Sequence, residues 1–453
     1  MWVCRQANIA SKDNCNTVKG RMKTSKMREI KNSMNKIENK IRLMVAVMAM
    51  VLALPMMAQS ETADITKVAE KGSRELSAPT AIETHIQAEI SLITCYPGSR
   101  NYELYGHTMI RVQIEGQDLL FNYGIFNFKQ KGFIYRFVKG DCDYSLAAYP
   151  MQYLTQGYED RKIVEQVLDL DDAQKVDVIS FLWNNVQPEN AVYRYGWAYN
   201  NCATKPRDII ENAVGGSLEY GEPKRAEATF RSIMADYDVN YPWQQFGIDL
   251  VLGYDLDHQL DYREQMFAPG ILMEAMAGAT QERDGKRIPV VKATNILVAG
   301  GDEGAVLGPT PLVLTPMFVF TLLVVIVLVI TVKERLGKCH YRWLDSVVFG
   351  IYGTIGILVA FLTFVSSHYG TSSNLNIVWL HPLLLLPAIL VWVKPMRPLV
   401  AIIHVVNALL IVLLVAGWNW LPQVGNVALL PMAGISLIRS VNYVIALKRG
   451  CVK

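Results

Sequence analysis

One cysteine, Cys202, lies where its thiol could act as a nucleophile. It follows two asparagines in the segment YNNCATKPRDII and precedes a stretch predicted to be helical, from near Thr204 to Ala213. The positive end of a helix lowers the pKa of a thiol, and its free N–H groups can hold an oxyanion. Pro206 fits only within a first helical turn, so the helix is expected to start at or after Ala203.

A thiol nucleophile needs a base, and histidine is the usual one. His107 begins a strand-like run in YELYGHTMIRV, and Asn122 lies in LLFNYG on the next predicted strand. An amide on a neighbouring strand could bond the second ring nitrogen and fix the tautomer of the base. The three residues therefore predict a Cys-His pair oriented by Asn122. Taken singly, a cysteine is more often a small buried residue, and a histidine more often a core residue.

The elements that must position these residues are strands and amphipathic helices. Alternating and β-branched patterns predict strands at Glu89–Tyr96, His107–Ile114 and Leu119–Tyr123, an extended aromatic segment at Tyr193–Tyr199, and helices at Asp171–Val186, Arg225–Asp236 and Pro269–Ala277. The second and third strands form a hairpin around Glu115–Asp118. The fold class is α+β with an antiparallel sheet.

Three further groups of residues have two interpretations each. Cys95 and Cys142 form a disulfide or are two buried thiols, and with Cys202 they make an odd number, so at least one thiol is free or pairs between chains. The segment DLDHQLD places Asp255, Asp257, His258 and Asp261 close together, as a divalent-cation site or a solvated loop. The aromatic residues Trp197, Tyr199, Trp243 and Phe246 line an acyl groove or belong to the core.

Charge divides the 453 residues into three blocks. Residues 1–60 hold 11 Lys and Arg against 3 Asp and Glu, and residues 306–453 hold 10 against 2. The totals are 44 and 41, so residues 61–305 hold 23 basic and 36 acidic side chains. An acidic middle block argues against nucleic-acid binding, which needs a basic face. We therefore expect an N-terminal extension with a signal peptide (1–60), an exported catalytic domain (61–305) and a membrane domain (306–453).

The N-terminal block has the pattern of a signal peptide. The apolar stretch Leu43–Met57 follows Lys36, Lys40 and Arg42, and small residues at Ala58–Ser60 supply a cleavage site. Translation is expected to start at Met34. The alternative is an uncleaved anchor, although 15 apolar residues are short for a membrane span, which needs about 20.

The C-terminal block predicts five membrane-spanning helices. Its long apolar runs are Pro311–Val332, Ser346–Ser366, Leu375–Val393, Pro398–Leu421 and Asn426–Leu447. The loops between them alternate between Lys/Arg-bearing and free of Lys and Arg, which places the C-terminus in the cytoplasm and the middle domain in the periplasm or outside the cell. Arg439 interrupts the fifth run, either as a functional residue or by snorkelling to the inner interface. His381 and His404 are expected to have interfacial or helix-packing roles.

A histidine-bearing strand, a hairpin with a polar residue and a later NC motif that opens a helix resemble a circularly permuted papain-like (NlpC-type) domain. Lecithin–retinol acyltransferase is of this type. More closely, the segments ISLITCYPG, YELYGHTMIRV, LLFNYGIFNF, NNCATKPRD and YPWQQFGIDLVLG, followed by five spans, are similar to the Lnb-type lipoprotein N-acyltransferase family. The similarity covers about residues 88–447.

The resemblance implies a membrane-anchored acyltransferase with a periplasmic catalytic domain in the bacterial inner membrane. Such an enzyme moves an acyl chain from a lipid to the α-amino group of the lipid-modified N-terminal cysteine of lipoproteins. Cys202 and His107 match the catalytic motifs, and Asn122 is the expected third residue. The partners are diacylated lipoproteins, phospholipids and the membrane, and no cofactor or metal is needed. The same Cys-His dyad would also serve a cell-wall cysteine peptidase or amidase, a phospholipase or, after decay of the site, a membrane adaptor.

Overall fold

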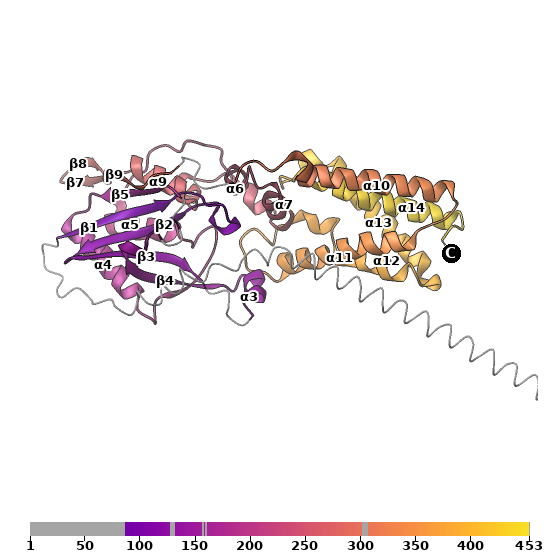
Figure 1. Cartoon of the computed structure of the whole chain (residues 1–453), viewed down its shortest axis with the longest axis horizontal. Helices are drawn as coiled ribbons and strands as arrows, with labels where there is room; N and C mark the ends of the chain where they lie inside the picture. Colours follow the sequence, from indigo (N-terminus) through magenta and orange to yellow (C-terminus); the bar gives the residue numbers. More distant parts are fainter. Residues whose placement is uncertain (1–86, 127–131, 156–157, 159–160, 301–306, 453) are drawn as a thin grey trace, which may run out of the picture. The chain divides into compact units, whose positions relative to one another are not determined.

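The computed structural model describes residues 87–126, 132–155, 158, 161–300 and 307–452. The predicted signal peptide and cleavage site lie outside these residues. The described chain forms a sheet with covering helices, followed by a helical part (Figure 1). The predicted α+β class with an antiparallel sheet is confirmed.

The central sheet has seven strands in the order β6-β4-β3-β2-β1-β5-β9, and neighbouring strands pair antiparallel. The strands are β1 (Ala88–Cys95), β2 (His107–Ile114), β3 (Gln117–Ile125), β4 (Asp143–Pro150), β5 (Ile163–Leu168), β6 (Val192–Arg194) and β9 (Val291–Val298), and β7 (Thr280–Arg283) pairs with β8 (Lys286–Pro289). Glu115 and Gly116 connect β2 and β3 with φ of 48° and 76°, which is the left-handed backbone that a two-residue hairpin turn requires.

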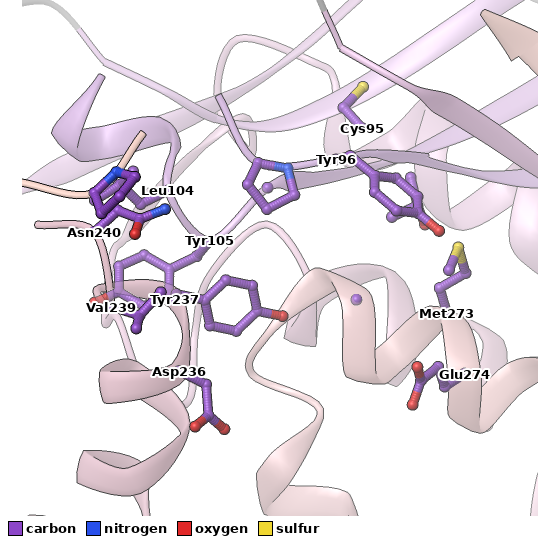
Figure 2. Close-up of a pocket in the computed structure, with 15 residues that line it drawn as sticks. Cys95, Tyr96, Leu104, Tyr105, Asp236, Tyr237, Val239, Asn240, Met273 and Glu274 are labelled. Carbon is purple, nitrogen blue, oxygen red and sulfur yellow. The ribbon is translucent and has the colours of Figure 1, made fainter. Parts of the chain in front are cut away.

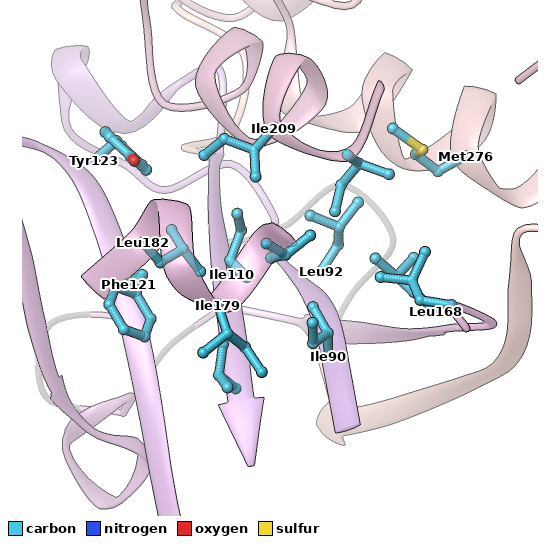
Figure 3. Close-up of a cluster of buried hydrophobic side chains, with 14 of the residues drawn as sticks. Ile90, Leu92, Ile110, Phe121, Tyr123, Leu168, Ile179, Leu182, Ile209 and Met276 are labelled. Atoms are coloured by element: carbon cyan, nitrogen blue, oxygen red, sulfur yellow. The ribbon is translucent and has the colours of Figure 1, made fainter. Parts of the chain in front are cut away.

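Helices bury one face of this sheet. The helices of this part are α3 (Phe133–Lys139), α4 (Asp172–Asn185), α5 (Thr204–Val214), α6 (Phe230–Tyr237), α7 (Pro242–Val251), α8 (Tyr262–Gln265) and α9 (Pro269–Gly278). Figure 3 shows Ile179 and Leu182 of α4 and Ile209 of α5 packed against Ile110 and Leu92 of the sheet, all at most 5% exposed. Because alternate residues of a strand face opposite sides, the side chains of His107 and Met109 point to the other face.

The structure shortens two of the predicted elements. The helix expected over Arg225–Asp236 begins only at Phe230, because Thr229 caps its first turn. The extended aromatic segment ends as a strand at Arg194, and a tight bridge between Gly196 and Asn200 follows.

The C-terminal part contains four helices long and apolar enough to cross a membrane: α10 (Pro316–Leu336), α11 (Arg342–Phe364), α13 (Arg397–Ala416) and α14 (Leu429–Lys448). α14 packs against both α10 and α13 (Figure 1). The third predicted run, Leu375–Val393, does not form one long helix. It contains short helical turns, among them α12 (Leu385–Leu390), because Pro382 and Pro387 interrupt the backbone hydrogen bonding.

α7 joins the two parts through apolar packing and hydrogen bonds. Phe246 and Leu250 of α7 belong to the same buried cluster as residues of α10, α11 and α14. The side chains of Asn374 and Asn376, which follow α11, donate to the carbonyl of Leu250 at 2.9 and 3.1 Å. The sheet domain is therefore packed onto the span ends through α7 as well as connected by the chain.

Arg439 does not snorkel to the membrane surface. Its side chain is fully buried, and it donates to Glu334 at 2.5 Å and to Asp345 at 2.7 Å. His340 lies 2.6 Å from the second oxygen of Asp345. We call these four residues the span ion cluster. The cluster links α10, α11 and α14, because a buried charge must find its counter-charge inside the protein. His404 packs between helices, with its ring on Phe349.

Candidate functional site

His107 begins a chain of buried hydrogen bonds on the sheet. Its Nε2–H donates to Oδ1 of Asn122 at 2.7 Å, and Nδ2 of Asn122 donates to the hydroxyl of Tyr149 at 2.8 Å. The Tyr149 hydroxyl lies 3.4 Å from the sulfur of Met109. Asn122 and Tyr149 are at most 2% exposed, so these bonds fix the imidazole and leave Nδ1 for another partner.

Cys202 lies in the turn that leads into α5, two residues before the helix begins at Thr204, as predicted. Asn201 caps this turn: its Oδ1 accepts from the backbone N–H groups of Ala203 at 2.8 Å and Thr204 at 2.9 Å. Its Nδ2 donates to the carbonyls of Trp197 and Phe267. Asn201 therefore fixes the backbone beneath the sulfur, a role that sequence analysis missed although the NNC segment displayed it. The expectation of free helix N–H groups is wrong for Ala203 and Thr204.

Gly124 lies where His107 and Cys202 approach each other. A β-bulge interrupts the pairing of β3 and β4 at this glycine, whose φ is 101°. A Cβ atom at Gly124 would lie 3.7 Å from Cε1 of His107 and 3.8 Å from Cβ of Cys202. The imidazole and the thiol are thus brought together from β2 and α5 across a backbone position that has no side chain. Both side chains are partly exposed and can meet a substrate.

The electrostatics of this pair favour a thiolate beside an imidazolium. Burial raises the pKa of the Cys202 thiol, but the charge and hydrogen bond of His107, with backbone N–H groups of Thr108 and Cys202, bring that pKa below its usual value. Burial lowers the pKa of His107, but the Cys202 thiolate and the hydrogen bonds with Cys202 and Asn122 raise it above its usual value.

Tyr158 covers the imidazole from the other side. Its ring stacks on His107 with centroids 5.8 Å apart, and the guanidinium of Arg161 lies 4.9 Å from the Tyr158 ring centre. Arg161 pairs with Glu103 at 2.5 Å. No sequence motif indicated that Tyr158 or Arg161 belongs to the site, because their proximity to His107 depends on the pairing of β1 with β5.

Two family models match this chain. The model of the Lnb N-terminal periplasmic domain matches residues 83–235, and that of the Lnb transmembrane domain matches residues 309–450. Together they cover more than half of the chain, and the first includes the Cys202, His107 and Asn122 motifs. The chain belongs to the Lnb family. It is a membrane protein with a periplasmic domain. No curated protein and no solved structure matches it.

The other cysteines of this Lnb-family chain are not competing nucleophiles in the periplasmic domain. Cys95 and Cys142 are free, buried thiols, so of the two interpretations the structure has no disulfide between them. Burial raises the pKa of Cys95 to about 12 and raises that of Cys142 above its usual value.

The acidic segment DLDHQLD is structural in the Lnb-family chain. Asp257 pairs with Arg231 at 2.7 Å, Asp261 caps α8, and Nδ1 of His258 contacts the carbonyl of Asp255. Among the described residues, no group of three or more His, Cys, Asp or Glu side chains could hold a metal ion.

A pocket of about 590 Å³ opens beside the beginning of β2 (Figure 2). Tyr96, Tyr105 and Tyr237 contribute rings to its wall, and Met273 of α9 and Pro309 of the segment before α10 also line it. Neither Cys202 nor His107 is among its lining residues, although Gly106 directly precedes His107. The pocket therefore lies next to the Cys-His pair, and it is an alternative place for a substrate to bind.

Proposed function

We propose that this chain is an acyltransferase of the inner membrane that moves an acyl chain from a lipid ester to the α-amino group of the N-terminal cysteine of lipoproteins. The observation that carries the proposal is the Cys202–His107 pair, oriented by Asn122, in a chain of the Lnb family. The partners are diacylated lipoproteins and phospholipids, with the catalytic domain in the periplasm and the C-terminus in the cytoplasm. We propose catalytic roles for Cys202, His107 and Asn122, and domain boundaries near residues 60 and 305.

In the first half-reaction the Cys202 thiolate attacks the ester carbonyl. The carbon–sulfur bond forms, the carbon–oxygen bond of the ester breaks, and the leaving oxygen takes the proton held by His107. In this proposal the backbone N–H of Cys202 stabilises the negative charge that develops on the carbonyl oxygen. The product is a thioester on Cys202 and a lysolipid.

In the second half-reaction the lipoprotein amine attacks the thioester. His107, now neutral, takes a proton from the nitrogen as the carbon–nitrogen bond forms and the carbon–sulfur bond breaks. Cys202 leaves as a thiolate and restores the ion pair. A thioester suits this step because an amine displaces a thiolate more readily than an alkoxide. Both substrates are held at the bilayer surface, which raises their effective concentration.

The test is mass spectrometry of lipoprotein N-terminal peptides from a strain that lacks this gene and has no second such enzyme. Wild-type protein should restore N-acylation, and Cys202→Ser should not. Cys142→Ser is the matched control, because this buried thiol of the same domain lies outside the proposed mechanism. Acylated N-termini in the deletion strain contradict the proposal. Altered muropeptides with unaltered lipoproteins would instead indicate a peptidase or amidase, and full complementation by Cys202→Ser an adaptor.

A further inference from the structure

A row of aromatic rings leads from the membrane-facing side of the sheet domain toward Cys202. The rings of Phe137, Phe133, Phe126, Tyr144 and Tyr195 follow one another with centroid distances of 6.0, 6.2, 4.9 and 4.1 Å. Successive ring planes are tilted by only 16–25°. Most of these rings are partly exposed, and Tyr144 is buried. We call this set the aromatic row.

One end of the aromatic row lies at the end of a membrane span. The ring of Tyr135 in α3 packs on that of Phe361, near the end of α11, with the ring centroids 6.1 Å apart. The ring of Phe137 lies 5.6 Å from that of His368, just beyond α11. The N–H of Ser367 donates to the carbonyl of Lys139 at the end of α3. α3 is therefore held at the level where α11 leaves the bilayer.

The exposed side chains of α3 indicate what covers this end of the row. Ile134, Tyr135 and Phe137 are 54%, 60% and 45% exposed, although all three are large and apolar. Exposed apolar side chains at the end of a transmembrane helix are typical of the lipid interface, where aromatic residues are enriched. The bilayer surface would thus cover the exposed apolar side chains of α3.

The other end of the row lies beside the candidate nucleophile. The Gly196–Asn200 bridge folds the chain back on itself, with backbone hydrogen bonds of 3.1 and 2.8 Å. Tyr195 directly precedes this bridge, and Asn201 and Cys202 directly follow it. Phe126 in turn follows two residues after Gly124, where an added Cβ atom would lie within 3.8 Å of both His107 and Cys202.

We propose that the aromatic row holds the fatty acyl chain of the lipid donor between the bilayer at α3 and the sulfur of Cys202. The proposal rests on the proposed acyltransferase function and names where the donor binds. A long acyl chain reaching from the bilayer to Cys202 would bury its methylene groups along the ring edges, whereas a short acyl group would reach only the rings nearest the sulfur. The row, rather than the neighbouring pocket, then determines chain-length preference.

The experiment compares acylation of Cys202 by two esters, p-nitrophenyl palmitate in detergent micelles and p-nitrophenyl butyrate, followed by mass spectrometry of the intact full-length protein. Phe133→Ala and Phe137→Asp should each lower the palmitate-to-butyrate rate ratio by about tenfold, because each removes apolar contact only from the long chain. Phe181→Asp is the control for Phe137→Asp, since Phe181 lies on α4 and is similarly exposed at 47%. Its ratio should equal that of the wild type.

Two results would overturn the inference and leave the proposed function intact. One is that both row variants form the acyl-enzyme with the same palmitate-to-butyrate rate ratio as the wild type. The other is a lowered ratio in Met273→Trp, which narrows the 590 Å³ pocket, with no change in the row variants. If the wild type forms no acyl-enzyme with either ester, the covalent step of the proposed function has failed, and the inference fails with it.

Discussion

Replacing Asn122 by alanine tests whether its amide orients His107, the proposed catalytic base. The substitution removes the 2.7 Å hydrogen bond to His107 and leaves the imidazole Nε2–H without its acceptor. A hydrogen bond to a charged group contributes about 1.5–3 kcal/mol. At about 1.4 kcal/mol per factor of ten, the balance between the thiolate–imidazolium pair and the neutral pair shifts about 10- to 150-fold toward the neutral pair.

The assay is the rate at which iodoacetamide alkylates Cys202 near neutral pH, measured by peptide mass spectrometry. This rate follows the thiolate population, so Asn122→Ala should lower it by about 10- to 150-fold. Asn122→Asp keeps an oxygen acceptor in the same place and should restore most of the rate. Tyr149→Phe is the matched control, because it removes the other partner of Asn122 and leaves the bond to His107 in place.

Asn122 does not orient His107 if Asn122→Ala reacts within about threefold of the wild-type rate while its unfolding temperature is unchanged. An equal loss in Tyr149→Phe would also contradict it, because the effect would then come from general loosening of the sheet. A positioning role further predicts that the alkaline limb of ester turnover moves to lower pH in Asn122→Ala.

Three further outcomes follow from the geometry. The lowered pKa of Cys202 and the raised pKa of His107 predict a bell-shaped pH profile for the rate of ester acylation. The rate should rise as the thiol ionises, at a pH below the usual thiol pKa, and fall as the imidazolium deprotonates, at a pH above the usual histidine pKa. A profile with a single ordinary thiol titration would contradict this. Gly124→Ala should cost about 1–3 kcal/mol of stability through its positive φ and slow alkylation of Cys202, whereas Gly216→Ala, in open space, should change neither in thermal melts and alkylation assays. Arg439→Met should destabilise the protein by about 3–5 kcal/mol, measured by unfolding in detergent, because it leaves the carboxylates of the span ion cluster without their guanidinium; an unchanged melt would refute the ion-pair assignment.

Local patterns in the sequence predicted the elements whose information is local. The hairpin of β2 and β3 is fixed by a two-residue turn, and α4 and α5 by their amphipathic spacing and caps, so their bounds were predicted within a few residues. β9 was missed because it is largely exposed and pairs with β5 across more than a hundred residues. No local pattern shows such a partner. The third apolar run was predicted as one continuous helix from its hydropathy. Hydropathy does not register its prolines, and the run is divided into short helical turns.

The candidate site was predictable to the same extent. Residue type and position relative to strand and helix starts selected Cys202, His107 and Asn122, and the structure brings the three together. Tyr149 and Tyr158 could not be found in this way, because a tyrosine carries no positional signal until the sheet order is known. The position of Asn201 before the helix is typical of a capping residue. The sequence analysis instead expected the backbone N–H groups at the helix start to be free, whereas Asn201 accepts hydrogen bonds from two of them.

The attachment of the sheet domain to the spans has a consequence for the proposed chemistry. The segment that carries Cys202 is itself held by the membrane domain, since the indole of Trp197 donates to the carbonyl of Tyr369 at 3.3 Å. Trp243 of α7 likewise donates to the carbonyl of Leu314, just before α10. Two separate contacts, one on the segment that carries Cys202 and one on α7, fix the distance between the candidate site and the ends of the membrane spans. The proposed acyl donor and the proposed lipid-anchored acceptor would both be held at the bilayer surface. The fold would then supply the proximity that a reaction between two membrane-bound substrates requires.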